Sequence, residues 1–571
     1  MSNPMTPVRR FFNLLKVDKQ EILSIYVYAI FHGLVTLSLP LGIQAIINLI
    51  TGGQVSTSWI VMVIFVILGV AFTGVLQIMQ LTISENIQQK IFTRSAFEFA
   101  YRIPRMKLEA VDRDYIPELV NRFFDTLSVQ KGLSKILMDF SSASLQVLFG
   151  LVLLSLYHPF FILFSVLLIA IAYLVFRISG PRGLSTSIAE SHYKYEVAHW
   201  LEEVARAMET FKLAGDSPLP LQKTDEKVEG YLKSRKAHFR TLITQYINLV
   251  GLKVFIVAGL LIIGGLLVIN QQMNIGQFVA SEIIIILILG SIEKLILSME
   301  TIYDVLTALE KIGNVTDLPL DRDNGSRFDK DNEKGVSIQM KDVSYTFLGE
   351  KEDFLKNISL NLASGEKVCL SGYNGSGKSL LLQFLAGLYD EFRGTISYND
   401  VPIGNWFKED LHKVIGDNLI KEEIFKGTLM ENITLGKPYI SLDEVKKMSA
   451  VVGLQDFVSN QQFGYNTMML PEGRNLPKST RLKIILTRSL VGKPNVILIE
   501  NSFNQLNEKD KTSFINYLKR TNSTVVVISN DVHVAKLFER IIVLKDGAIM
   551  SDSAFEKTKK ATWFNEIFQT N

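Results

Sequence analysis

One glycine-rich segment has the residue types and spacing of a phosphate-binding loop. It lies after the apolar residues 368–370, precedes a helix-forming stretch at 380–386, and reads Gly372, Tyr373, Asn374, Gly375, Ser376, Gly377, Lys378, Ser379. The glycines let backbone N–H groups converge on phosphate oxygens, and the N-terminus of the following helix adds a positive dipole. Lys378 can reach the terminal phosphates and Ser379 can ligate Mg²⁺. The segment matches the P-loop pattern in its required setting and predicts a nucleotide site.

The region around this loop alternates between strands and helices. Apolar stretches at 336–340, 367–371, 496–500 and 524–529 predict strands, with helical stretches between them. This order is typical of an α/β domain with a largely parallel sheet. The polar residues 313–334 predict a linker before it. We therefore expect a P-loop domain at 335–571.

The overall composition excludes several other classes of site. The chain has one cysteine, Cys369, and seven scattered histidines, so neither a disulfide framework nor a metal-ligand spacing is present. Lys and Arg number 60 against 57 Asp and Glu, so no long-range basic field indicates nucleic acid as a partner. An apolar fraction of 48% over 571 residues is instead high enough to indicate a membrane portion.

The N-terminal half contains six long apolar stretches. The first has no charged residue and is too long for a cleavable signal peptide, so it predicts a retained membrane span. The six predicted spans cover residues 22–50, 59–82, 136–156, 160–176, 246–269 and 278–297. Together they predict a six-helix transmembrane domain at 1–312 in a multi-domain membrane protein that contacts the lipid bilayer.

The distribution of Lys and Arg predicts the orientation of these spans. The short connections at 51–58, 157–159 and 270–277 contain neither residue, whereas the segment before the first span and the connections at 83–135 and 177–245 contain many. Positive residues favour the cytoplasmic side. Both termini and the P-loop domain are therefore expected to be cytoplasmic, in a cell (inner) membrane. The two long connections are expected to be helices extended from the membrane, with two inserted soluble subdomains as the alternative.

Six spans followed by a P-loop domain resemble the exporter-type half-transporters of the ABC transporter superfamily over nearly the whole chain. Residues 343–347 are similar to the family segment whose last aromatic residue stacks on adenine, which assigns that role to Phe347 and binding of ATP with Mg²⁺ to the domain. Residues 425–433 are similar to the family segment that follows the Q-loop, and residues 464–467 to the segment that precedes the signature. Residues 274–280 are similar to a segment of type I secretion and peptide exporters, which implies polypeptide cargo and leaves lipid or amphiphile cargo open.

The positions that carry ATP hydrolysis in this family are occupied by other residue types. Glu500 stands where a Mg²⁺-supporting aspartate is expected and keeps a carboxylate, so it forms a predicted metal pair with Ser379. Asn501 takes the position of the catalytic glutamate and Asn530 that of the switch histidine, so no catalytic residue is intact. Further replacements are Ile420 for the Q-loop glutamine, with Asn418 as a poorer-placed substitute; Asn507 for the D-loop aspartate; and Leu476, Pro477, Lys478, Ser479, Thr480 for the signature Leu-Ser-Gly-Gly-Gln.

Together these features predict an ATP-binding exporter subunit with weak or no intrinsic hydrolysis. The resemblance implies a homodimer or a heterodimer with another ABC subunit, a possible periplasmic adaptor, and coupling segments around residues 116–122 and 211–215. The alternative hypothesis is a non-hydrolysing, ATP-sensing regulatory or scaffold subunit of a membrane transport complex. The sequence specifies neither the cargo nor the partner.

Overall fold

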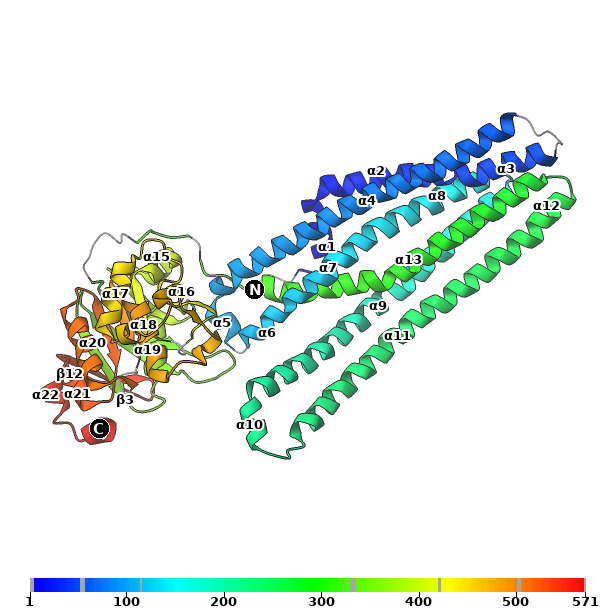
Figure 1. The fold of residues 1–571 in the computed structure, drawn as a ribbon. Coiled ribbons are helices and arrows are strands. Elements are labelled where there is room, and N and C mark those ends of the chain that lie inside the picture. Colours follow the sequence, from blue (N-terminus) through cyan, green and yellow to red (C-terminus); the bar gives the residue numbers. More distant parts are fainter. Residues whose placement is uncertain are drawn as a thin grey trace. The chain divides into compact units, whose positions relative to one another are not determined.

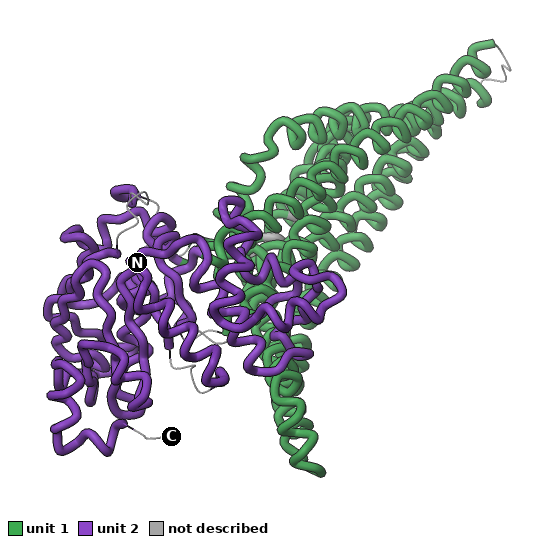
Figure 2. The backbone as a smooth tube through the Cα atoms, turned by 60° about the vertical axis from the view of Figure 1, so that its left-hand side comes forward, with its two compact units in different colours: residues 1–104, 114–318 green, residues 105–113, 319–571 purple. Residues whose placement is uncertain are grey.

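The computed structural model consists of two compact units (Figures 1 and 2). It describes residues 5–51, 57–112, 115–322, 324–328, 335–419, 423–500 and 505–568, apart from the side chains at 172, 175, 176, 178 and 179. Unit 1 comprises residues 1–104 and 114–318, and unit 2 comprises residues 105–113 and 319–571.

Unit 1 is built from long helices. Two π-helical turns, at Ile136–Phe140 and Leu260–Gly264, join α7 to α8 and α11 to α12. The helices are α1 (Pro7–Val17), α2 (Lys19–Thr36), α3 (Ser38–Thr51), α4 (Thr57–Arg102), α6 (Ile116–Asn121), α7 (Asp125–Lys135), α8 (Ser141–Ser155), α9 (Phe160–Arg206), α10 (Met208–Leu213), α11 (Leu219–Gly259), α12 (Gly265–Ile269) and α13 (Ile275–Thr316).

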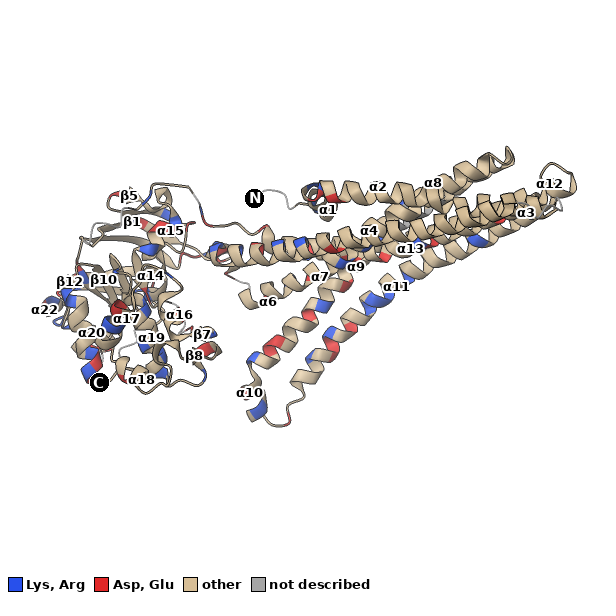
Figure 3. Cartoon of the chain, turned by 45° about the horizontal axis from the view of Figure 1, so that its top comes forward, with Lys and Arg blue, Asp and Glu red and all other residues tan. Residues whose placement is uncertain are grey.

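The helices of unit 1 are long enough to cross a membrane and continue beyond it. Among the described residues, five helical stretches have the length and apolar composition of membrane spans, and α9 begins with a shorter apolar part at Phe160–Ile171, within the fourth predicted span. At 1.5 Å per residue, the 46 residues of α4 and the 47 of α9 are each about 70 Å long, against about 30 Å for a hydrocarbon core. Charged residues are concentrated in the halves of α9 and α11 that lead to α10, where the cartoon is coloured blue and red (Figure 3).

Helix α13 provides much of the core of unit 1. Its buried face includes Ile284, Ile288 and Ile292, which pack with residues of α8, α9 and α11, while Val305 packs with residues of α2, α4 and α7. The helix begins with a capping box, because the Asn274 side chain accepts from Gln277 N at 2.7 Å and the Gln277 side chain accepts from Asn274 N at 3.0 Å. Such reciprocal caps satisfy backbone donors that a helix start leaves free.

Unit 2 contains a six-stranded sheet with the order β12-β11-β3-β10-β9-β6. All neighbours are parallel except the antiparallel pair β11–β12. The central strands are apolar and buried, as strands covered on both faces must be. The strands are β3 (Lys367–Gly372), β6 (Ile415–Asp417), β9 (Val496–Ile499), β10 (Thr524–Ile528), β11 (Arg540–Lys545) and β12 (Ala548–Ala554).

A second, antiparallel sheet has the order β2-β1-β4-β5. The strand predicted at 336–340 overlaps β1 of this sheet, whereas its other strands and its antiparallel pairing were not predicted. Its strands are β1 (Ile338–Tyr345), β2 (Leu355–Leu362), β4 (Arg393–Tyr398) and β5 (Val401–Pro402). Val343, Ile358 and Ile396 of this sheet share one hydrophobic core with Leu370 and α14 (Lys378–Leu385). The main helices on the other core are α16 (Leu429–Thr434), α17 (Leu442–Val451), α19 (Lys478–Leu490) and α20 (Glu508–Arg520).

Candidate nucleotide-binding site

The predicted P-loop joins the end of β3 to the start of α14, and its backbone requires glycine. Gly372, Gly375 and Gly377 have φ values of 147°, 75° and 93°, which lie in the region that L side chains rarely adopt. A Cβ at position 372 would lie 2.2 Å from the Leu544 carbonyl oxygen, whereas a Cβ at 375 would meet no atom within 4 Å. The loop is therefore packed closely at its start and open at its middle, where a phosphate group could approach the backbone.

Lys378 is turned toward the loop. Its Nζ donates to the carbonyl oxygens of Gly372 at 2.9 Å and of Tyr373 at 2.7 Å. Burial lowers the pKa of Lys378, and the nearby Glu500 carboxylate partly opposes this shift. Bound phosphates would supply negative charge beside the lysine, and this charge would favour its protonated form. The residues present therefore fit a nucleotide phosphate chain.

Ser379 and Glu500, the predicted Mg²⁺ pair, lie side by side. The Ser379 hydroxyl donates a hydrogen bond to the Glu500 carboxylate. Glu500 directly follows β9, and its backbone N–H donates to Asn418 Oδ1 at 2.6 Å. Hydroxyl and carboxylate oxygens are ligands that Mg²⁺ accepts. Asn418 therefore supports the backbone of Glu500, and Ile420 lies outside the described residues.

Asn530, at the position expected for the switch histidine, is bonded to the start of the P-loop. Its Oδ1 accepts from Gly372 N at 3.1 Å, and its Nδ2 donates to Gly372 O at 3.0 Å. An amide side chain can make both bonds because it carries a donor and an acceptor. His533 is exposed, and its backbone N–H donates to Asp531 at the start of α21 (Val532–Ala535).

The remaining residues of the loop differ in their surroundings. The Tyr373 hydroxyl donates to Glu566 at 2.5 Å, and Lys545 Nζ lies 5.2 Å from the centre of its ring. Asn374 is exposed. The Ser376 hydroxyl is buried with no hydrogen-bond partner among the described residues. A buried hydroxyl without a partner is unusual, and at this position it is consistent with a phosphate-binding loop.

Phe347, the predicted adenine-stacking residue, belongs to an aromatic cluster beside the loop. Its ring centre is 5.1 Å from that of the buried Tyr345 and 5.3 Å from that of Phe354, both in edge-to-face geometry. A Cβ at Gly377 would lie 3.5 Å from Phe354, so the cluster adjoins the P-loop. Phe347 is half-buried, and its stacking role stays a prediction.

Two of the replaced hydrolytic positions, the signature segment and the D-loop position, lie at the starts of helices. Pro477 precedes α19 without a side-chain cap, and Lys478 begins the helix as an exposed cation. Asn507 caps α20, because its Oδ1 accepts from Asp510 N at 2.8 Å. Asn501 lies outside the described residues. Neither Asn507 nor Asn530 has a side chain that can accept a proton from water at neutral pH.

Comparisons with known proteins match both units of the chain. A family model described as ABC transporter transmembrane region matches residues 22–292, and one described as ABC transporter matches residues 355–504. A solved bacterial Atm1-family ABC exporter with ATP bound matches with a TM-score of 0.80 and 16% identity, over 95% of this chain and 96% of that one.

Two curated relatives are similar to this chain in sequence over part of their length. The alpha-hemolysin translocation ATP-binding protein HlyB of Escherichia coli O157:H7 is 25% identical over 376 residues, which cover 65% of this chain and 53% of the relative. The mesentericin-Y105 transport/processing ATP-binding protein MesD of Leuconostoc mesenteroides is 23% identical over 452 residues, covering 78% of this chain and 62% of the relative. The match thus spans about half to three fifths of the length of these proteins.

The helical unit and the P-loop unit define a multi-pass membrane protein with the ABC exporter fold, which confirms the fold class predicted from the sequence. The chain belongs to the ABC transporter family. The comparisons do not assess hydrolysis, so the loss of catalytic residues stays a prediction.

A short helix in the first long connection packs within unit 2 and was missed by the sequence analysis. In α5 (Leu108–Val111), Glu109 accepts from the backbone N–H groups of Asp390 and, at 3.0 Å, Glu391, while Leu108 packs against the core of the unit. The predicted coupling segment at 116–122 contains α6, which belongs to unit 1, and its coupling role stays a prediction. The second, at 211–215, overlaps α10 and stays a prediction.

A polar cavity of about 220 Å³ among α7, α9 and α13 allows a test of pH dependence. The Asp304 side chain is exposed, since it borders the cavity, and partial loss of hydration there, with the charges of Glu300 and Glu190, raises the pKa of Asp304 from 3.8 to about 6. A raised carboxyl pKa reduces stability as the pH rises from about 4 to 6, since the folded state then binds more protons than the unfolded state. We expect Asp304→Asn to raise the thermal midpoint only modestly at about pH 7.5, because solvent screens an exposed carboxyl, and to have little effect below about pH 4. Melting curves across this range test this, with Asp225→Asn, an exposed carboxyl that does not line the cavity, as control. The same change in both variants would contradict the prediction.

Proposed function

We propose that this chain is an ATP-binding subunit of an ABC exporter, with weak or no hydrolysis of its own. The observation that carries the proposal is a site with a phosphate loop and a Ser379–Glu500 pair whose switch position holds Asn530, bonded to Gly372. General-base catalysis contributes about 10²- to 10⁴-fold to a rate. Loss of the base together with other hydrolytic residues leaves a site suited to holding ATP with Mg²⁺.

The organisation of the chain supports a cytoplasmic ATP-binding unit and a dimer. Positive residues gather in the connections predicted to be inside. In the ABC family each composite site pairs the P-loop of one chain with the signature of another, and residues 476–480 depart from that signature. With a partner whose motifs are intact, one composite site would combine this chain's P-loop with the partner's intact signature. The other would combine the partner's P-loop with the altered signature at residues 476–480 of this chain. We propose a heterodimer, with a homodimer as the alternative.

We propose polypeptide cargo, which is supported by relatives whose names describe alpha-hemolysin translocation and mesentericin-Y105 transport/processing. The decisive experiment is transport into inverted membrane vesicles that contain this chain, with and without an ABC subunit encoded beside it. ATP-dependent uptake of a candidate peptide that needs both chains supports an export subunit. No uptake under any combination, with cargo and partner both confirmed in the membrane, contradicts it.

A second candidate function is an ATP-sensing regulatory subunit. It is favoured by the bonds between Asn530 and Gly372, which link the switch position directly to the phosphate loop. The Lys378→Ala variant separates the two functions in the same vesicles. If transport by the partner requires Lys378 of this chain although this chain hydrolyses nothing, the regulatory function is supported.

A further inference from the structure

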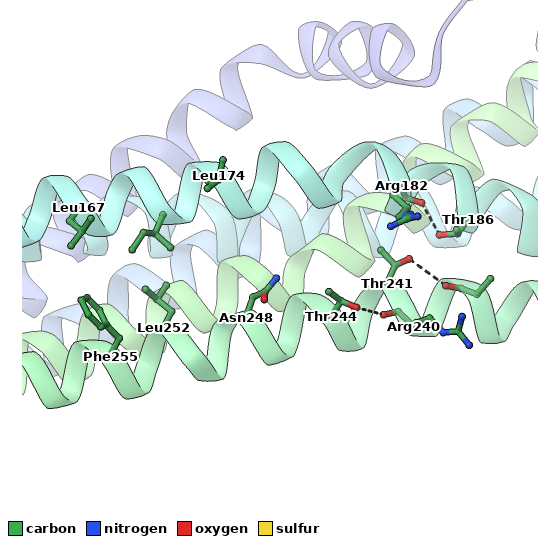
Figure 4. Close-up of a pocket in the computed structure, with 12 residues that line it drawn as sticks. Leu167, Leu174, Arg182, Thr186, Arg240, Thr241, Thr244, Asn248, Leu252 and Phe255 are labelled. Carbon is green, nitrogen blue, oxygen red and sulfur yellow. Dashed lines mark hydrogen bonds between the residues drawn. The ribbon is translucent and has the colours of Figure 1, made fainter.

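A groove of about 830 Å³ lies between α9 and α11 in unit 1, outside the nucleotide site (Figure 4). Its two ends differ in chemistry. Leu167 and Ile171 of α9 face Leu252 and Phe255 of α11 at one end, within the predicted membrane spans. The other end is polar and is lined by Arg182, Thr186, Arg240, Thr241, Thr244 and Asn248.

The polar end of the groove carries two arginines, and the sequence on either side of each arginine contains no Asp or Glu close by. No Asp or Glu occurs at positions 140–189 or 230–281. Arg182 and Arg240 are exposed, and neither guanidinium has a hydrogen bond or ion pair with another residue that the structure describes. Lys253 on α11 is different, because its Nζ is 2.6 Å from Glu293 of α13. The arginines of the groove are thus available to an anion.

The walls of the groove are held together beyond its cationic end. Thr186 Oγ1 lies 2.9 Å from His238 Nδ1, and Arg235 forms an ion pair with Glu190 at 3.2 Å. At the apolar end, Leu252 and the neighbouring Ile256 pack with Phe164 and Leu168 in one core. These contacts fix the spacing of the two helices on both sides of the opening, so the groove is a formed feature of the unit.

The dimensions place the apolar and cationic groups along one axis. Ile171 and Arg182 are eleven positions apart on α9, and Leu252 and Arg240 are twelve apart on α11, or about 16–18 Å at the rise of a helix. The apolar residues lie inside the predicted spans, and the arginines lie beyond the predicted inner ends of those spans. At this level Lys and Arg side chains can meet the negatively charged headgroups of the cytoplasmic leaflet.

We propose that this groove binds an anionic phospholipid of the inner leaflet. The acyl chain lies against Leu167, Ile171, Leu252 and Phe255, and the phosphate lies between Arg182 and Arg240. Arginine suits this position because its planar fork matches phosphate geometry. The hydroxyl of Thr244 and the amide of Asn248 are close enough along α11 to meet the glycerol region. The site belongs to unit 1 alone and does not depend on ATP binding.

The test is native mass spectrometry of the full chain in detergent, titrated with phosphatidylglycerol and, in parallel, phosphatidylcholine. We expect preferential phosphatidylglycerol binding that Arg182→Gln/Arg240→Gln weakens about tenfold or more. The matched control Arg177→Gln/Lys236→Gln removes two exposed charges from the same helices outside the groove and should change binding by less than about twofold. Thr244→Trp, which fills the groove and keeps both arginines, should weaken binding as strongly as the double substitution.

Several results would overturn the proposal. Equal weakening by the control pair would mean that the lipid responds to general surface charge, and retained binding in Thr244→Trp would place the lipid elsewhere. Competition by glycerol phosphate as effective as that by phosphatidylglycerol would mean a free-anion site without a role for the acyl chain. Conversion of a dimer to a monomer by Thr244→Trp, without lipid in the wild type, would mean that a second copy covers the groove.

Discussion

Purified in detergent or in nanodiscs, the chain is expected to bind ATP with Mg²⁺ and to hydrolyse it no faster than its Lys378→Ala variant. Lys378 lies in the loop that is shaped for phosphates, so its removal should abolish binding. Hydrolysis should be absent in both proteins because Asn501 and Asn530 replace a base and a switch histidine. A missing general base costs about 10²- to 10⁴-fold, and residues that act as a unit lose activity together.

The measurement is a phosphate-release assay beside equilibrium binding of a fluorescent ATP analogue. A rate in the wild type that clearly exceeds that of Lys378→Ala would contradict the prediction, whatever the binding data show. The substitution Asn501→Glu provides a further control, because it restores a base and leaves the other positions unchanged. We expect it to remain nearly inactive alone, since Asn530 would still be bonded to Gly372.

Local patterns in the sequence were sufficient to predict the elements around the P-loop. The segment 367–371 was predicted as a strand, and β3 covers Lys367–Gly372; the segment 524–529 was predicted likewise, and β10 covers Thr524–Ile528. Both strands are continuous apolar runs, which a buried parallel sheet requires. The apolar spans were found for a similar reason, since lipid imposes a length and a composition that one stretch of sequence reveals.

Features that depend on contacts between distant residues could not be predicted in this way. Glu109 meets the backbone of Asp390 across 281 positions, and no local pattern marks a four-residue helix as part of another unit. Of the sheet formed by β1, β2, β4 and β5, only a strand at 336–340, which overlaps β1, was predicted. The pairing of β1 with β2 and β4, including its register shifts, depends on contacts between strands that are separate in the sequence. Only part of what Asn530 does could be predicted. The sequence shows that it stands where the family's switch histidine is expected, and the structure adds that its side-chain amide is hydrogen-bonded to the backbone of Gly372.

A substitution at Gly372, where β3 ends and the P-loop begins, is expected to reduce both the stability of unit 2 and its binding of nucleotide. A Gly372→Ala substitution would place a Cβ 2.2 Å from the Leu544 carbonyl oxygen, at a φ of 147°. The backbone at neither residue can move away easily, because Leu544 lies in β11 and is paired with Gly372 of β3 in the sheet. Overpacking costs about 1–3 kcal/mol and a left-handed backbone about 1–2 kcal/mol, so we expect a loss of roughly 3 kcal/mol, with ATP binding lost as well.

Gly375→Ala is the matched control, since it changes the same loop at a φ of 75° where a Cβ would meet no atom within 4 Å. It should cost about 1 kcal/mol through backbone strain alone. Hydrogen exchange of the full chain can measure both effects in the relevant strands: amides of β3 and β10 should exchange much faster in Gly372→Ala than in Gly375→Ala, while those of α13 in unit 1 remain protected. Equal protection of β3 in the two variants would mean that the contact with Leu544 relaxes without cost, and that the tight start of the loop serves binding alone.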